Sequence, residues 1–531
     1  MTSFILRLSS VAAILASVPI GCSSTTDNCA NTSSCVPPSA GASGSAEAGA
    51  SGMNDSAGEG GAGAGGGVSG SDGGESGESG TAGMSGDSGA GPGETPCDPS
   101  KSPSEESCLV SNEYAIFVAP TGKDGADGSQ AAPVKTLAKA LELAADSKIV
   151  IACDASYDER LTLTASARLY GGFGCPGRAS PWEYEAGKKA KVAPSNRGLA
   201  LKITAGDAAV VIEDFEFDAK DGVEPGESSI AAFVNASTNV TLRRVKLVAG
   251  TAVDGENGTL VPWTFPDPLS LKGNSANGDS GGGANTGMCP VGPKPRGGAG
   301  GNGGEGAVTT GGSGTPDLAL GKGGVAGSCS TSGTGQDGAN ASPQPAAAGA
   351  TKLGTITLTG WNGSAGADGA SGTPGQGGGG GAGALTGGGG GAGGSGGCGG
   401  AGATGGKAGG SSISLLVLSS SLALDANELV AGNAGKGGSG LPGQAGQPGG
   451  SGGVQVPDGC PGGKGGQGGQ GGAGGGAAGG ISVGIAYQGA LPVVDLETTF
   501  ATGLAGAKGI GGVSGTNDGI AGVKQDVFQV P

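Results

Sequence analysis

The sequence predicts an all-β protein: a right-handed parallel β-helix with an N-terminal capping helix and long glycine-rich loop insertions. The first observation is a motif that returns at residues 199–222, 230–250 and 413–432, with a weaker copy at 481–503. Each copy has a short apolar run, a small polar turn, a second run of alternating apolar residues and a glycine. Alternation with a period of two is typical of strands, and a recurring unit of this length is typical of stacked coils.

The second observation is that aligned copies agree in charge and apolarity. The alignment predicts the outward columns Glu213–Arg243–Asp425 and Glu216–Lys246–Glu428, the inward column Phe217–Leu247–Leu429, and Asp214 facing Arg244. Stacked strands lie about 4.8 Å apart, so the members of a column are expected to touch. Opposite charges in a column favour this register over a slip of one residue.

Composition limits the size of the core and the kind of partner. The chain of 531 residues contains 126 glycines and 29 prolines, and only 35% of its residues are hydrophobic. This glycine and proline content is typical of low-complexity sequence, so only a minority of the chain can form a core. The net charge of −17 argues against a nucleic-acid partner, because phosphates need a basic face.

Residues 1–21 read as an export signal peptide, with Arg7 before a short apolar run. The small residue before Cys22 resembles a bacterial lipobox, although Pro19 replaces the usual leucine. The resemblance implies lipidation of Cys22 and a membrane anchor; the alternative is an ordinary cleaved signal. Ser23 is not the aspartate that retains such lipoproteins at the inner membrane, so the resemblance implies the outer membrane or cell surface.

Ten further cysteines form an even set, as expected in an oxidising compartment. Their order in the chain suggests the pairs Cys29–Cys35, Cys97–Cys108, Cys153–Cys175, Cys289–Cys329 and Cys398–Cys460. Metal binding is not expected, because the chain has no CxxC spacing and no histidine.

Residues 22–95 are predicted to form a lipid-anchored low-complexity tether, since they are rich in serine, glycine and alanine and lack periodicity. The folded part then begins with residues 96–250, the N-terminal part of the β-helix with its cap. A strand at 114–118 is followed by an amphipathic helical pattern at 133–144. This order resembles the N-terminal cap of pectate-lyase-like β-helix proteins, which implies a helix that closes one end of the coil.

Asp124 and Asp127 lie between that strand and that helix. They could hold Ca²⁺ through oxygen ligands. The favoured interpretation is the chemistry of Asp-Gly turns.

Residues 251–411 and 433–480 are glycine-rich insertions that separate the rung at 412–432 from its neighbours, and residues 481–531 form the last rung and C-terminal tail. Both insertions start where a rung ends, so they are expected to leave the coil at one corner. A three-residue period, as in GGKGGQGGQGG at 462–472, suits polyproline-II-like strands packed through glycine; disorder is the alternative. The composition is similar to that of PGRS-type surface proteins.

No catalytic residue, metal site or cofactor is predicted. The absence of histidine excludes Ser-His-Asp chemistry, and no GK[ST] string exists. The only dense acidic strip consists of Glu213, Asp214, Glu216 and Asp218, with Arg243 and Arg244 as the matching bases. Asp218 is the one acid without an opposite charge in the alignment. We expect a non-enzymatic cell-surface lipoprotein with a structural, adhesive or matrix-interaction role, its partners being the membrane and extracellular polysaccharide or surface proteins. The alternative is a β-helix protein that binds or cleaves a polysaccharide.

Overall fold

The computed structural model describes residues 97–145, 147–304, 309–325 and 328–531. They belong to the compact unit Ala90–Pro531, and all that follows concerns this unit. The signal peptide, the tether, and residues Cys22, Cys29 and Cys35 lie outside the described residues, so their assignments stay predictions.

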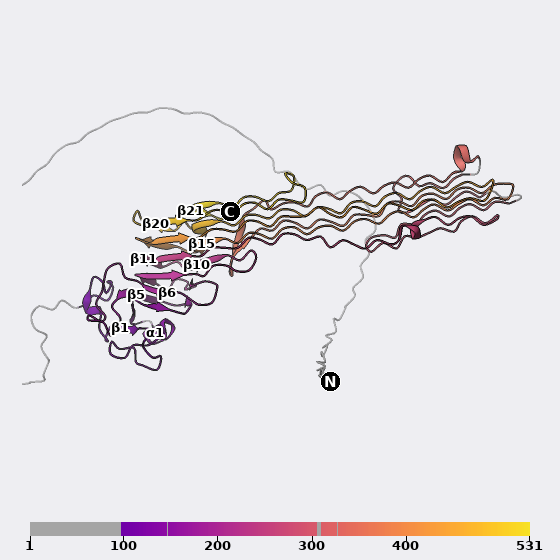
Figure 1. The fold of residues 1–531 in the computed structure, drawn as a ribbon. Helices are drawn as coiled ribbons and strands as arrows, with labels where there is room; N and C mark the ends of the chain where they lie inside the picture. The colour runs from indigo at the N-terminus through magenta and orange to yellow at the C-terminus, as the bar shows by residue number, and fades with distance from the viewer. Residues whose placement is uncertain (1–96, 146, 305–308, 326–327) are drawn as a thin grey trace, which may run out of the picture. The chain divides into compact units, whose positions relative to one another are not determined.

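Most strands belong to three parallel sheets, and the chain visits these sheets in turn (Figure 1). In hydrogen-bonded order, sheet A contains β1 (Ala115–Val118), β2 (Ile149–Cys153), β5 (Ala167–Phe173), β8 (Val210–Glu213), β11 (Val240–Arg243), β16 (Leu422–Asp425) and β19 (Val493–Val494). Sheet B contains β3 (Ser156–Tyr157), β6 (Ala190–Val192), β9 (Phe215–Asp218), β12 (Lys246–Ala249), β17 (Glu428–Ala431) and β20 (Thr499–Thr502). Sheet C contains β4 (Leu161–Leu163), β7 (Leu201–Ile203), β10 (Ser229–Asn235), β15 (Ser412–Leu418), β18 (Ser482–Gln488) and β21 (Lys524–Gln529). The parallel stacking is compatible with a parallel β-helix.

The predicted register is confirmed. Lys246 pairs with Glu216 on one side and Glu428 on the other, and Leu247 pairs with Phe217 and Leu429 in the same way. The alternating residues of β9 explain this register, because the rings of Phe215 and Phe217 stack at 5.7 Å between centroids inside the core. A shift of one residue would exchange these rings for carboxylates.

The predicted helix is α1 (Leu137–Ala144), which contacts β1 and β2. Its buried residues Leu137, Ala140 and Ala144 belong to the main core. Thr136 accepts a hydrogen bond from the N–H of Lys139, which is an ordinary N-cap. The other helical elements are short: η1 (Ser107–Leu109), η2 (Pro268–Leu271) and the π-helical turn η3 (Cys329–Gly333).

The middle strands of sheet C, β10, β15 and β18, are buried on both faces. The outer face of the sheet packs against the antiparallel hairpin of β13 (Gly354–Thr357) and β14 (Gly360–Gly363), which lies within the first glycine-rich stretch. Phe233, Leu416 and Val483 on the sheet contact Ile356 of the hairpin in a second core. This covering explains why Leu415, Leu416 and Val417 of β15 are consecutive apolar residues rather than alternating ones.

A ladder of buried serines marks the corner where the chain passes from sheet B to sheet C. Ser412 donates from its hydroxyl to the carbonyl of Gly250 at 2.7 Å and accepts from the N–H of Gly432 at 2.7 Å. Ser482 donates in the same way to Gly432 at 2.8 Å. The glycine that ends each motif is required here, because a Cβ on Gly432 would lie 2.7 Å from the backbone of Gly250.

The glycine-rich residues continue these rungs as a lattice of extended strands (Figure 1). Along 391–410, every third N–H donates to the segment 460–478, as in Gly397 to Gly466 and Gly400 to Gly469. The carbonyls of residues 391–410 accept hydrogen bonds from the N–H groups of residues 366–381, again at every third residue. Three residues per turn is the repeat of a polyproline-II-type helix, and each glycine face is where the next strand approaches.

The close approach excludes side chains over much of the lattice. A Cβ on Gly468 would overlap the carbonyl oxygen of Cys398, and one on Gly400 would overlap that of Gln444. Ala382, Ala392 and Cys398 are fully buried among the glycines. Glycine is therefore a packing requirement here.

Candidate functional site

The dense acidic strip and its arginines lie at the corner between sheets A and B. Asp214, Arg244 and Ala426 follow β8, β11 and β16 on successive rungs, and all three have positive φ angles, of 55°, 51° and 54°. Few side chains adopt this left-handed conformation without cost. The repeated turn places Asp214 and Arg244 directly above one another.

These charges form one connected network. Arg244 contacts Asp214 at 2.8 Å and Glu213 at 2.9 Å, while Arg243 contacts Glu213 at 3.0 Å and Asp425 at 2.8 Å. The Ser102 hydroxyl donates to Glu213 at 2.8 Å, and the N-terminal segment that carries Ser102 leaves Glu213 only 3% exposed. The predicted pairs are confirmed, and both oxygens of Glu213 are already bonded.

The prediction that Asp218 lacks a partner is wrong. Lys191 of β6 contacts Asp218 at 2.7 Å and Glu216 at 2.8 Å. Lys246 instead forms its ion pair with Glu428, at 2.9 Å. β6, which stacks before the first recognised copy of the motif, is too short to be recognised as a copy itself, so the alignment did not include Lys191.

The charge state of Arg244 does not suit a catalytic base. Desolvation lowers the pKa of Arg244, but the hydrogen bond and charge of Asp214 outweigh it, so the pKa is raised overall. Desolvation and the charge of Asp214 also raise the pKa of Tyr184, whose hydroxyl donates to Asp214 at 3.2 Å. Desolvation lowers the pKa of Lys189, which donates to the carbonyl of Arg244. A base must release its proton near the working pH, and the arginine is held in its charged form.

The acidic residues before α1 act in turns. Asp124 Oδ1 accepts from the N–H groups of Lys135 and Thr136, at 3.0 and 2.9 Å, and from the Thr136 hydroxyl at 3.1 Å. Asp127 accepts from the N–H of Ser129 at 3.0 Å. Three donors converge on one oxygen of Asp124, as in a turn-forming aspartate.

The eight described cysteines form four disulfides, which indicates an oxidising compartment. The expected pairs Cys97–Cys108 and Cys153–Cys175 are present. The other two expected pairs are wrong, because the structure joins Cys289 to Cys398 and Cys329 to Cys460. Lattice strands from different insertions lie side by side, so the nearest cysteine in space is not the next in sequence.

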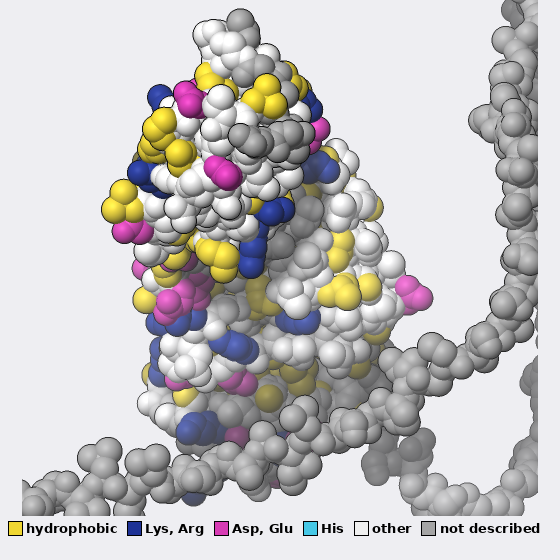
Figure 2. All heavy atoms as spheres, turned by 90° about the vertical axis from the view of Figure 1, so that its right-hand side faces the viewer, with side chains coloured by type: hydrophobic (Ala, Val, Ile, Leu, Met, Phe, Trp, Pro, Cys, Tyr) yellow, Lys and Arg dark blue, Asp and Glu magenta, His cyan; other side chains and the backbone are white. Residues whose placement is uncertain are grey.

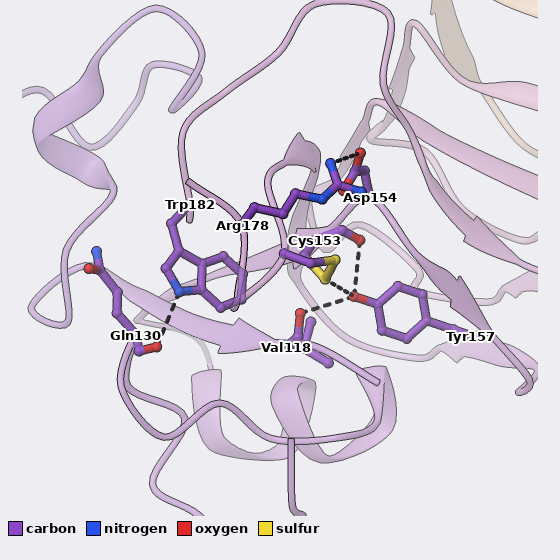
Figure 3. The surroundings of a disulfide bond; sticks show 8 residues. Val118, Gln130, Cys153, Asp154, Tyr157, Arg178 and Trp182 are labelled. Atoms are coloured by element: carbon purple, nitrogen blue, oxygen red, sulfur yellow. Dashed lines mark hydrogen bonds and ion pairs between the residues drawn. A yellow bond between two sulfur atoms is a disulfide. The ribbon is translucent and has the colours of Figure 1, made fainter. Parts of the chain in front are cut away.

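The Cys153–Cys175 disulfide lies in a hydrogen-bonded cluster (Figure 3). The Tyr157 hydroxyl donates to the carbonyls of Val118 and Cys153, at 3.0 and 3.1 Å. Nearby, the indole N–H of Trp182 donates to the carbonyl of Gln130 at 3.1 Å. This cluster joins the first rungs to the covering loops. Asp154 binds Arg178 through Oδ2 at 2.8 Å, and its Oδ1 is buried without a hydrogen-bond partner among the described residues.

The lattice contains a recurring bond that the sequence analysis missed. Asp254 and Gly255 bind Lys436 at two points: the Gly255 N–H donates to the Lys436 carbonyl at 2.7 Å, and the Lys436 N–H donates to Asp254 Oδ1 at 2.6 Å. We call this pair of bonds the side-chain clamp. Within the described residues the same geometry, with side-chain distances of 2.6–2.8 Å, joins Asp221 to Thr251, Asn257 to Ser439, Asp337 to Lys464, Asn340 to Gln467 and Asn433 to Leu504. Recurrent Asx-Gly and Asx-Ala dipeptides were the available signal, but in isolation they predict turns.

Charges of both signs lie interspersed on the face seen in Figure 2. No helix among the described residues is long and apolar enough to cross a membrane. In the comparisons with known proteins, no family model, no curated protein and no solved structure matches the chain.

Proposed function

We propose that this chain is a cell-surface lipoprotein with a structural, adhesive or matrix-interaction role. Its β-helix, which we take to be right-handed and capped by α1, serves as the base, and the glycine lattice is the part presented to the surroundings. The lipid anchor at Cys22 would hold it at the outer membrane.

The observation that carries this proposal is the continuity of the lattice with the rungs. The ion pair Lys246–Glu428 and the clamp Asp254–Lys436 both join residues 182 positions apart. The parallel pairing of sheet B therefore runs into the glycine-rich residues without a change of register. A lattice continuous with its base can transmit load along its hydrogen-bonded strands, which suits a scaffold.

The charged corner between sheets A and B supports a scaffold over an enzyme. Glu213, Asp214, Arg243 and Arg244 bind one another, and Glu216 and Asp218 bind Lys191. An active site normally leaves a nucleophile or base free to reach its substrate. The groups of this corner serve the stacking of the rungs.

Localisation can be tested with the full-length chain, tagged after β21, in a diderm bacterium. Labelled palmitate should enter the protein, Cys22→Ala should abolish labelling, and an antibody should stain intact cells. An unlabelled protein released into the medium would contradict the anchor. Cells that display Gly468→Ala should bind matrix-coated surfaces less than cells that display Gly125→Ala, since nothing lies within 4 Å of a Cβ at position 125.

The alternative function, binding or cleavage of a polysaccharide, has a separate test. Purified protein would be incubated with uronic-acid polymers, with and without Ca²⁺, and assayed for unsaturated product. The scaffold proposal predicts no product. Product formation that Arg243→Ala and Arg244→Ala abolish in a folded protein would establish the alternative.

A further inference from the structure

Residues 260–269 interrupt the glycine-rich strand that leaves β12. Val261 and Leu269 are 76% and 78% exposed, and Trp263 and Phe265 between them are partly exposed. A strand of small residues would satisfy the lattice at this place, as it does on either side. Bulky apolar side chains on a surface are a common sign of an interaction site.

Two glutamines hold this segment at the distance of a side chain from the lattice. Gln444 accepts from the main-chain N–H of Trp263 at 2.9 Å and donates to its carbonyl at 3.0 Å. Gln447 donates to the carbonyl of Pro266 at 2.7 Å. Direct strand-to-strand bonds are replaced by amide side chains here, because Trp263 and its neighbours cannot approach as closely as glycine. The backbone of Trp263 is fixed on both sides.

Trp263 differs from the other two tryptophans in its indole N–H. The N–H of Trp182 donates to Gln130, and that of Trp361 is buried. The indole N–H of Trp263 has no partner among the described residues, and it is not one of the buried polar atoms that lack a partner. It is therefore open to a ligand.

The chain around Trp263 carries hydrogen-bonding groups, and residues 259–267 contain no Lys or Arg and one acid, Asp267. Four residues earlier, Thr259 and Thr404 form an exposed pair of hydroxyls 3.3 Å apart. Gln444 also accepts from the N–H of Ala401, which brings this end of the Thr404 strand next to Trp263. The site thus combines an aromatic ring, a free N–H and hydroxyls.

We propose that Trp263 is the central residue of a binding site for neutral polysaccharide. The negatively charged face of an aromatic ring attracts the partly positive C–H groups of a sugar ring. The free indole N–H and the Thr259 and Thr404 hydroxyls would bind sugar hydroxyls. An acidic polysaccharide would call for Lys or Arg beside the ring, and the residues named here have neither. This inference rests on the proposed matrix-interaction role and names its partner class.

The test measures binding of the purified full-length protein to three neutral polymers, laminarin, dextran and galactomannan, and to the acidic polymer polygalacturonate. Affinity electrophoresis and tryptophan fluorescence are the two readouts. We expect retardation by at least one of the three neutral polymers and none by polygalacturonate. Trp263→Ala should weaken that binding at least tenfold, and Trp263→Phe should retain part of it. Val261→Ala is the matched control, because it removes neighbouring exposed apolar surface without the ring, and it should bind as the wild type does.

Each other outcome overturns the site. The site is refuted if the protein binds no neutral polymer or prefers polygalacturonate. It is also refuted if Trp263→Ala and Val261→Ala lose binding equally, which would indicate a general apolar contact for a protein partner. An unchanged thermal unfolding curve for Trp263→Ala shows that the fold is intact. Binding in solution by a protein that never reaches the cell surface would refute the proposed function and leave the site standing, while surface display without binding would do the reverse.

Discussion

Asp254 Oδ1 accepts a hydrogen bond from the main-chain N–H of Lys436, 182 residues later, at 2.6 Å. Three residues further on, Asn257 binds Ser439 with the same offset, at 2.8 Å. The clamp therefore advances with the three-residue repeat of the lattice and fixes which strand residues face each other. It also satisfies main-chain N–H groups at exposed positions of the lattice, such as that of Lys436.

Removing a clamp should loosen one strand pair without unfolding the rungs. Asn257→Ala leaves the N–H of Ser439 without its side-chain partner, and a net cost of about 0.5–1.5 kcal/mol is expected for one such hydrogen bond. Denaturant unfolding measures the cost, and hydrogen exchange should rise locally around Ser439. Asn196→Ala is the control, since Asn196 is exposed and makes no side-chain bond within the described part of the chain; equal effects of the two substitutions would refute the clamp.

A methyl group inside the lattice should be far more disruptive than one in a loop. Gly468→Ala would place Cβ onto the carbonyl of Cys398, and overpacking of this kind costs about 1–3 kcal/mol or more. The expected result is faster proteolysis of residues 433–480, whereas Gly125→Ala should be neutral. A Gly468→Ala protein as resistant as the wild type would show that these strands do not touch.

The two acidic partners of Arg243 should contribute very different amounts to the free energy of unfolding. Glu213 is 3% exposed and bonded to Arg243, Arg244 and Ser102, whereas the side chain of Asp425 is 47% exposed. Removing a buried partner leaves the remaining charges without their counterion, so Glu213→Ala should lower the free energy of unfolding by about 3–5 kcal/mol. Asp425→Ala should cost about 0–1 kcal/mol. Chemical denaturation of both variants is the measurement, and equal losses would contradict the burial of this corner.

Asp124 should make stability depend on acid pH. Desolvation opposes the effect, but hydrogen bonds from Thr136 and Lys135 lower the pKa of Asp124 below 3.8 in the folded protein. A lowered folded pKa means that the stabilisation is present above the unfolded value and is lost as pH falls through the folded value. The difference in unfolding temperature between wild type and Asp124→Asn should be constant near neutral pH and shrink below about pH 4.

The same oxygen of Asp124 also provides a test for calcium. Because it already accepts three hydrogen bonds, neither added Ca²⁺ nor EDTA should change the unfolding temperature. A Ca²⁺-dependent increase that Asp124→Asn removes would restore the metal-site alternative.

The rungs could be predicted because their pattern is local and repeated. Phe217, Leu247 and Leu429 occupy the same place in recognisable copies, so alignment alone placed them in one column. Lys191 could not be placed in this way, since β6 has only three residues and no clear motif around it.

The remaining features depend on contacts between distant segments. The Cys329–Cys460 disulfide and the clamps require knowing which lattice strands are neighbours, and glycine repeats carry no side chains from which to read that order. The position of Trp263 likewise depends on Gln444, 181 residues away, a neighbour that no local sequence pattern predicts.

The account depends most on the lattice being an ordered continuation of the rungs. Hydrogen exchange of the full-length protein, followed by mass spectrometry of peptides from residues 391–410 and 460–478, tests this most directly. The account predicts protection comparable to that of β15 and β18, since every third N–H of residues 391–410 is bonded to residues 460–478, and further N–H groups, such as those of Ser395 and Lys464, are bonded to other segments. Complete exchange of these glycine-rich amides within seconds, while β15 and β18 stay protected, would contradict it.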